Sequence, residues 1–117
     1  MRGELETTFT DLVNRVRDAV GDASVTVCSA GPERVGKIGI VTGGAGSEIA
    51  TIAQAGVDTF ITGEGPHWTY ALAEELGVNV LYGGHYATET FGVKALAAEL
   101  SKKFKIPWGF LDHSSGL

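Results

Sequence analysis

The sequence predicts an α/β fold of three layers, with flanking helices on both sides of a largely parallel sheet. From Lys37 onward, short apolar runs of strand length alternate with segments whose apolar residues recur every three or four positions. Glycines stand at the ends of most of these segments, so the 17 glycines among 117 residues indicate turns. Strands that alternate with helices imply right-handed crossovers and parallel neighbours. We expect a single α/β domain spanning residues 1–117.

The predicted elements follow this alternation along the chain. A helix is expected over residues 5–20, because its apolar residues share one face and Gly21 stands where a C-terminal cap would. A short strand should follow at 24–28. The regular part of the chain then consists of strands at 37–41, 58–62, 78–82 and 106–111, and helices at 47–55, 66–76 and 88–104.

Composition excludes several classes of function. The net charge of −5 makes nucleic acid an unlikely main partner, because phosphate binding needs a basic face. Cys28 is the only cysteine, which rules out an internal disulfide and a cysteine-based zinc cluster. No apolar run approaches membrane-spanning length and no signal peptide is evident, so we expect a cytoplasmic protein without a membrane segment.

Polar turns follow three of the predicted strands and hold all three histidines of the chain. In an open α/β sheet, the loops after the carboxyl ends of parallel strands share one edge, and ligands bind there. We therefore expect six polar side chains near one another at this edge: Glu64, His67, His85, Glu89, Asp112 and His113.

His85 and Glu89 are the candidate metal ligands. An imidazole nitrogen and a carboxylate oxygen form a mixed donor set that suits zinc, iron or manganese. In the structural alternative, Thr88 caps the last helix, Glu89 stabilises its N-terminus, and His85 is a surface turn residue. The spacing alone leaves both interpretations open. Two ligands cannot hold a metal tightly, so further ligands must come from elsewhere.

Glu64 and His67 are candidates for contacting the metal ligands or for facing a substrate. They stand three residues apart, next to the aromatic Trp68. The alternative is a helix that starts at Pro66 and packs Trp68 into the core.

The glycine-rich segment 43–47 is a candidate phosphate cradle before a helix. Glu64 lies twenty residues after Gly44, where a dinucleotide fold places its ribose-binding acid. However, Ile49 occupies the position of the last glycine in that fingerprint. The alternative is a tight turn in which Ser47 caps the following helix.

Three segments together resemble the Nif-three-like family, which is named for an NGG-one-interacting factor and is also described as GTP cyclohydrolase I type 2-like. The segments are DTFITGE at 58–64, GHYATE at 84–89 and GVKAL at 92–96. The resemblance implies an α/β fold of two similar halves, a dinuclear metal centre and a toroidal hexamer. It also implies that His85 and Glu89 are the metal ligands supplied by the C-terminal half.

The family's N-terminal half supplies a paired His-His motif and an aspartate, and no two histidines are adjacent in this chain. The chain therefore resembles the C-terminal half only, and we expect either a homo-oligomer or a missing N-terminal half to complete the site. The expected function is that of a metal-dependent hydrolase acting on an unknown small molecule. A non-catalytic metal-binding or assembly module and a nucleotide-binding domain are the alternatives.

Overall fold

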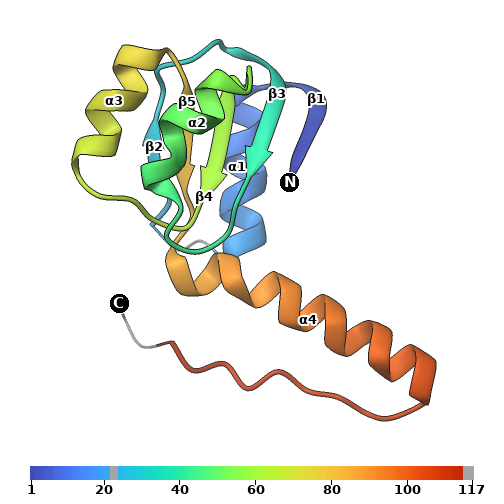
Figure 1. Cartoon of the computed structure of the whole chain (residues 1–117). Helices are drawn as coiled ribbons and strands as arrows, with labels where there is room; N and C mark the ends of the chain where they lie inside the picture. Colours follow the sequence, from blue (N-terminus) through green and yellow to red (C-terminus); the bar gives the residue numbers. More distant parts are fainter. Residues whose placement is uncertain (22–23, 115–117) are drawn as a thin grey trace.

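A mixed five-stranded sheet forms the centre of the protein in a computed structural model, which describes residues 1–21 and 24–114 (Figure 1). The α/β prediction is confirmed, but the sheet is not largely parallel. Only the three central strands are parallel, and each edge strand is antiparallel to its neighbour. The rule that crossover connections join parallel strands applies only to the strands that alternate with helices. Both edge strands precede that part of the chain. The strand order is β1 (Arg2–Thr8), β3 (Arg34–Ile40), β4 (Thr59–Thr62), β5 (Asn79–Tyr82), β2 (Thr26–Cys28).

Helices cover both faces of the sheet, which confirms the three layers. Helix α1 (Phe9–Val20) packs on one face, and α2 (Ile49–Gln54) and α3 (Trp68–Leu76) pack on the other (Figure 1). Successive residues of a strand point to opposite faces. On β4, Ile61 accordingly joins the α1 core, and Phe60 joins the core beneath α2 and α3. Both faces of the central strands are therefore buried, which explains their continuous apolar runs.

The first predicted helix begins later than expected. The segment before Phe9 belongs to β1, which pairs with β3 and places Thr8 opposite Arg34. Thr8 caps α1, since its hydroxyl oxygen accepts a hydrogen bond of 3.1 Å from the Asp11 amide. Pairing with β3 provides hydrogen-bond partners for backbone groups that would otherwise be bonded within a longer helix. Gly21 ends α1 in the left-handed conformation, as predicted (φ 79°).

The middle elements lie close to their predicted positions. The expected helix at 47–55 is a short 3-10 turn, η1 (Gly46–Glu48), followed by α2, and Ser47 caps neither of them. Helix α3 ends at Gly77 in the left-handed conformation. Among the helices of the described residues, none combines the length and the apolar content that a membrane crossing requires.

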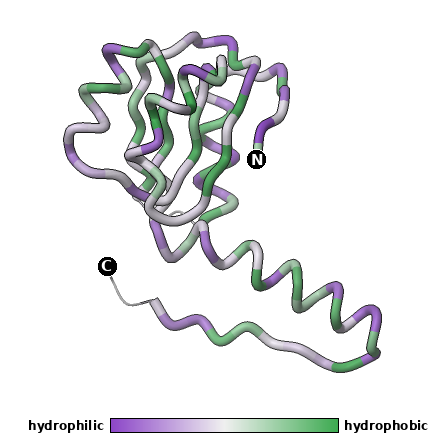
Figure 2. Tube along the Cα trace, in the orientation of Figure 1, coloured by the Kyte–Doolittle hydropathy of each residue, from purple (hydrophilic) through white to green (hydrophobic). Residues whose placement is uncertain are grey.

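The last helix and the residues after it extend away from the sheet. Helix α4 (His85–Phe104) begins three residues before the predicted start and projects from the body of the protein (Figure 1). Figure 2 shows hydrophobic positions recurring along it. The strand predicted at 106–111 is not formed, because no strand within the described residues lies beside this segment to pair with it. Instead, the segment runs back along α4.

Candidate metal centre

Two glycine-rich turns pack against the start of α4 and fix its position. The carbonyl of Gly43, after β3, accepts hydrogen bonds from the amides of Gly63 (2.9 Å) and Glu64 (3.1 Å), after β4. The Gly43 amide donates to the buried Thr88 hydroxyl at 3.0 Å. Thr88 thus ties α4 to the turns, and Gly84, rather than Thr88, occupies the cap position of the helix. The interpretation of Thr88 as the N-cap is therefore wrong.

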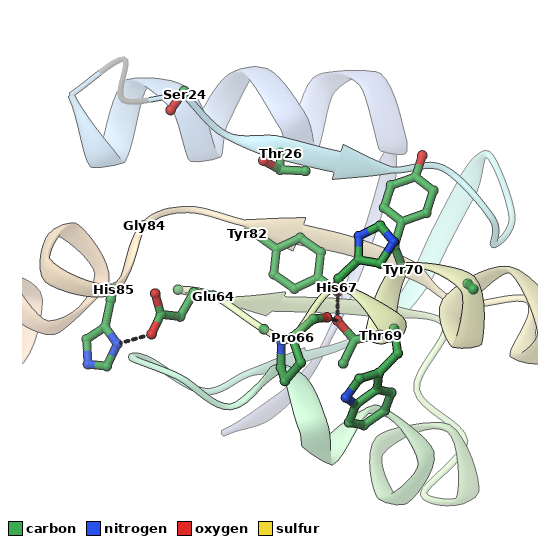
Figure 3. A pocket seen from close by; sticks show the side chains of 14 residues that line it. Ser24, Thr26, Glu64, Pro66, His67, Thr69, Tyr70, Tyr82, Gly84 and His85 are labelled. Carbon is green, nitrogen blue, oxygen red and sulfur yellow. Dashed lines mark hydrogen bonds and ion pairs between the residues drawn. The ribbon is translucent and has the colours of Figure 1, made fainter. Parts of the chain in front are cut away.

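His85 lies between two carboxylates at this junction. Its Nδ1 is 2.8 Å from Glu64 Oε1, and its Nε2 is 3.4 Å from Glu89 Oε1 (the Glu64–His85 contact is dashed in Figure 3). A carboxylate only accepts hydrogen bonds, so Nδ1 carries a proton and donates it to Glu64. This leaves Nε2 directed toward Glu89. All three side chains are substantially exposed to solvent.

The carboxylates change the titration of His85. The hydrogen bond with Glu64, the largest cause, raises the pKa of His85 above its usual range, and the negative charge of Glu89 adds to this effect. Partial desolvation acts in the opposite direction. A raised pKa in the folded state means that the interaction stabilises the fold below the ordinary histidine pKa. The contribution is lost as the pH rises through the raised value.

We expect the Glu64→Gln substitution to lower the pKa of His85 in the metal-free protein, because an amide cannot compensate the charge of an imidazolium. NMR titration of the histidine ring protons measures this directly. Glu75→Gln, on the exposed side of α3, is the matched control and should leave the His85 titration unchanged. An unchanged His85 pKa in the Glu64 variant would show that the two side chains do not interact in solution.

Two glycines leave room beside the donor atoms. A Cβ atom at Gly43 would lie 2.7 Å from Glu89 Oε1 and 3.4 Å from His85 Nε2. A Cβ atom at Gly44 would lie 3.5 Å from Glu64 Oε1. Gly43 also has a positive φ of 71°, which a side chain would disfavour. The glycine-rich turn was evident in the sequence, but nothing in the sequence indicated that it lies next to His85 and Glu89.

A pocket of about 590 Å³ opens beside the Glu64–His85 pair (Figure 3). Its wall includes Trp68, Tyr70 and Tyr82, three aromatic side chains. The Tyr82 hydroxyl is 2.8 Å from the hydroxyl of Thr69, and burial raises the pKa of Tyr82, so this hydroxyl stays protonated at neutral pH. Trp68 is 52% exposed, which overturns its expected place in the core. The pocket offers a partly aromatic surface for a small molecule next to the candidate ligands.

The structure brings only some of the predicted side chains together. Glu64 contacts His85 directly, but the ring of His67 lines the pocket without a hydrogen bond to any described residue. Asp112 instead accepts a hydrogen bond of 2.9 Å from the Tyr86 hydroxyl, and the backbone amide of His113 donates to the same tyrosine oxygen. The last strand does not form, so Asp112 and His113 reach this region from the segment that follows α4, and Asp112 lines a second pocket together with His85.

The candidate ligand pair is incomplete within the part of the chain that the structure describes. There, no group of three or more histidine, cysteine, aspartate or glutamate side chains is placed to hold a metal ion. The role of His85 and Glu89 as metal ligands stays a prediction, and any metal would need further donors.

The glycine-rich segment 43–47 forms a tight turn next to Glu64 and Thr88. The Gly46 amide donates to the Glu64 carbonyl at 3.0 Å, and the Gly43 amide is bound to Thr88. The carboxylate of Glu89 lies against Gly43 and would repel a phosphate. Two amides of the segment are thus paired within the protein, and nucleotide binding by this segment stays a prediction.

The family model described as Duf34/NIF3 (NGG1p interacting factor 3) matches residues 1–115. The chain belongs to the NIF3 family. This confirms the resemblance that the segments around Glu64 and His85 had indicated. It also accounts for an α/β fold with this arrangement of turns.

Known NIF3 relatives are considerably longer than this chain. A GTP cyclohydrolase 1 type 2 homolog of Deinococcus radiodurans is 39% identical over 107 residues, which are 92% of this chain and 40% of the relative. Among solved structures, protein ybgI of unknown function has a TM-score of 0.87 and 32% identity, covering 97% of this chain and 47% of the other. TTHA1606 from Thermus thermophilus has a TM-score of 0.78 and 38% identity, covering 100% of this chain and 45% of the other. The chain thus spans less than half the length of these three proteins.

Proposed function

We propose that this NIF3 chain binds a divalent metal ion through His85 and Glu89 and provides half of the site of a metal-dependent hydrolase. The observation that supports this most strongly is the orientation of the His85 ring. Glu64 accepts the Nδ1 proton at 2.8 Å, and Nε2 faces the Glu89 carboxylate at 3.4 Å. Metal-binding histidines commonly donate their second ring nitrogen to a carboxylate, which fixes the tautomer and makes the free nitrogen a stronger ligand.

The residues at the site fit a metal such as zinc, iron or manganese. Nitrogen and oxygen donors of this kind suit all three ions. The absence of a side chain at Gly43 leaves space beside both donor atoms. In addition, two carboxylates around one imidazole give the site a negative charge that favours a cation. Because two donors do not complete a coordination shell, the remaining ligands come from outside the described residues.

Each residue at the site has a distinct role in this proposal. Glu64 orients the His85 ring and holds its Nδ1 proton, and Glu89 supplies the oxygen ligand. A bound divalent metal would supply a water molecule of lowered pKa as the nucleophile for hydrolysis. The adjacent pocket, with Tyr82 and Trp68 in its wall, would hold a small-molecule substrate. The names of the curated relatives make nucleotides, GTP among them, the first substrates to assay.

Manganese titration followed by NMR tests the metal site even if binding is weak. Paramagnetic Mn²⁺ should broaden the signals of residues around His85 and Glu89 first, and EDTA should restore them. Zn²⁺ should displace Mn²⁺ and shift the His85 ring signals, because it competes for the same nitrogen. Broadening spread evenly over the acidic surface would contradict the proposal, since it would indicate non-specific attraction to a chain of net charge −5.

A non-catalytic assembly module is the second candidate function. It is favoured by the large apolar surface on α4, which has no role in the proposed chemistry. Stable association without bound metal and without hydrolysis would support this alternative.

A further inference from the structure

Hydrogen-bond acceptors line part of the pocket beside the Glu64–His85 pair. One of them is the hydroxyl oxygen of Tyr82, which lies 2.8 Å from the Thr69 hydroxyl. The Thr69 hydroxyl donates its single proton to the Pro66 carbonyl at 2.6 Å, so the Tyr82 hydroxyl is the donor in its contact with Thr69. The Tyr82 oxygen therefore offers only lone pairs to a molecule in the pocket.

Glu64 supplies a second acceptor, and this one is charged. Its Oε1 accepts the Nδ1 proton of His85 at 2.8 Å, and its Oε2 has no hydrogen-bond partner among the described residues. The Glu64 side chain is 57% exposed, so a ligand can reach the carboxylate. Hydrogen bonds from N–H groups to a carboxylate are stronger than those between neutral groups. This end of the pocket therefore favours a molecule that donates hydrogen bonds.

Aromatic rings form much of the remaining wall. Trp68, Tyr70 and Tyr82 line the pocket, and Trp68 is 52% exposed. In the view of Figure 3, the Tyr82 ring lies between Glu64 and the ring of His67. Planar heterocycles stack on exposed rings of this kind. The volume of about 590 Å³ lies within the range of small-molecule sites, ~300–1,000 Å³. The wall thus suits a planar ring system.

The described lining of the pocket does not suit a phosphate group. None of these lining residues is a lysine or an arginine. His85 can carry a positive charge, but it lies between the carboxylates of Glu64 and Glu89. The amides of Thr69 and Tyr70, in the first turn of α3, are already bonded to carbonyls of the same turn. Phosphate groups are bound by arginine, lysine or free amides at a helix N-terminus. An unphosphorylated ligand therefore fits this pocket better.

We infer that the pocket binds an unphosphorylated planar heterocycle whose edge carries a ring N–H next to an amino group. These adjacent donors bond to the Glu64 carboxylate, and the ring stacks on Trp68. Guanine nucleosides and pterins share such an edge. The inference rests on the proposed function, because it names the substrate class of that hydrolase site. Trp68 is then a specificity-determining residue, and Glu64 recognises the donor edge in addition to orienting His85.

The fluorescence of Trp68 tests this inference in the full 117-residue chain, in buffer containing EDTA. The chain has two tryptophans, so the Trp108→Phe variant leaves Trp68 as the only indole. Guanosine should quench Trp68 to saturation. Inosine, which lacks the amino group, should bind more weakly, and adenosine, whose ring nitrogen is an acceptor, about tenfold more weakly than guanosine. GTP should bind no more tightly than guanosine.

Three outcomes of these titrations would overturn the inference. The first is adenosine that binds as tightly as guanosine, and the second is GTP that binds more tightly than guanosine. The third concerns the source of the edge. Saturation-transfer NMR compares guanosine with neopterin, a pterin, and the tighter ligand identifies the ring system. Binding of neither molecule would show that the pocket does not recognise this edge.

Matched substitutions assign the two recognition roles. Trp68→Ala should weaken guanosine binding about tenfold, because it removes the stacking surface. Trp108→Ala, which removes an indole that is 46% exposed and outside the pocket, should have no effect. Glu64→Gln should reduce the preference for guanosine over adenosine, and Glu75→Gln should preserve it. Circular dichroism confirms that each variant is folded. A preference that survives Glu64→Gln, or equal effects of the two tryptophan variants, would contradict these roles.

The use of EDTA separates this inference from the metal site. Guanosine binding by a chain that shows no Mn²⁺ broadening around His85 would refute only the metal proposal. Mn²⁺ broadening around His85 without guanosine or neopterin binding would refute only the assignment of the substrate class.

Discussion

His85→Ala is expected to abolish specific metal binding by this NIF3 chain. The substitution removes the nitrogen donor that faces Glu89 at 3.4 Å and leaves Glu89 as the single candidate ligand. Its effect should exceed that of Glu64→Gln, because Glu64 only orients the ring and removing such an outer partner typically costs ~10–100-fold in affinity. Isothermal titration with Zn²⁺ or line broadening by Mn²⁺ measures both losses. The expected order of affinity is wild type, Glu64→Gln, then His85→Ala.

His67→Ala is the control for this series. The His67 side chain lines the same pocket but makes no hydrogen bond to any described residue, so its removal should leave metal affinity unchanged. The variant also distinguishes the two roles that the sequence left open for His67, which are contact with the metal ligands and contact with a substrate. If His67→Ala weakens metal binding as much as His85→Ala, the assignment of the ligands is wrong.

Gly63→Ala is expected to cause a large loss of stability in the turns that hold the candidate site. A Cβ atom at this position would lie 2.6 Å from the Gly43 carbonyl oxygen, 2.7 Å from Thr88 Oγ1 and 2.8 Å from His85 Cα. Two of these three atoms belong to the backbone, so the contacts cannot be relieved by rotating a side chain. Overpacking of this kind costs about 1–3 kcal/mol, and the turn's several close contacts place Gly63 at the upper end. Chemical denaturation measures the change in the free energy of unfolding.

Gly92→Ala is the matched control for Gly63→Ala. Gly92 lies within α4, and a Cβ atom there would meet nothing within 4 Å. Alanine favours a helix interior over glycine by about 0.5–1 kcal/mol, so this variant should be as stable as wild type or slightly more stable. Because the Gly63 change moves α4 relative to the turns, it should also weaken metal binding. A Gly63→Ala protein with unchanged stability and metal affinity would show that the turns are not packed as described.

Much of the fold could be predicted from local patterns. The alternation of apolar runs and amphipathic segments located β4, α3 and β5 to within about two residues, since each carries its own periodicity and glycine stop. Residues 5–8 were assigned to a helix wrongly, because Leu5 and Phe9 fit a helical spacing although Leu5 lies in a strand. Strand pairing depends on β3, which is remote in sequence, and a local pattern cannot report it.

The candidate site was also predictable in part, because one of its contacts lies within a single helix. His85 and Glu89 stand four residues apart in one helix, so their proximity follows from the chain itself. The contact between Glu64 and His85 joins two turns, and it required β4 and β5 to be parallel neighbours. The positions of His67 and Asp112 could not be predicted. The position of His67 depends on how helix α3 begins, and that of Asp112 depends on the strand expected at 106–111, which does not form.

By itself, the sequence determined the α/β class, the positions of the central elements and the His85–Glu89 pair. These features depend on periodicity, turn residues and spacing within single elements, all of which are local. Only the tertiary structure decided that the sheet is mixed, that Glu64 holds the His85 ring and that the large apolar side chains of α4 are exposed. These features depend on contacts between segments far apart in the chain, which no local pattern reports.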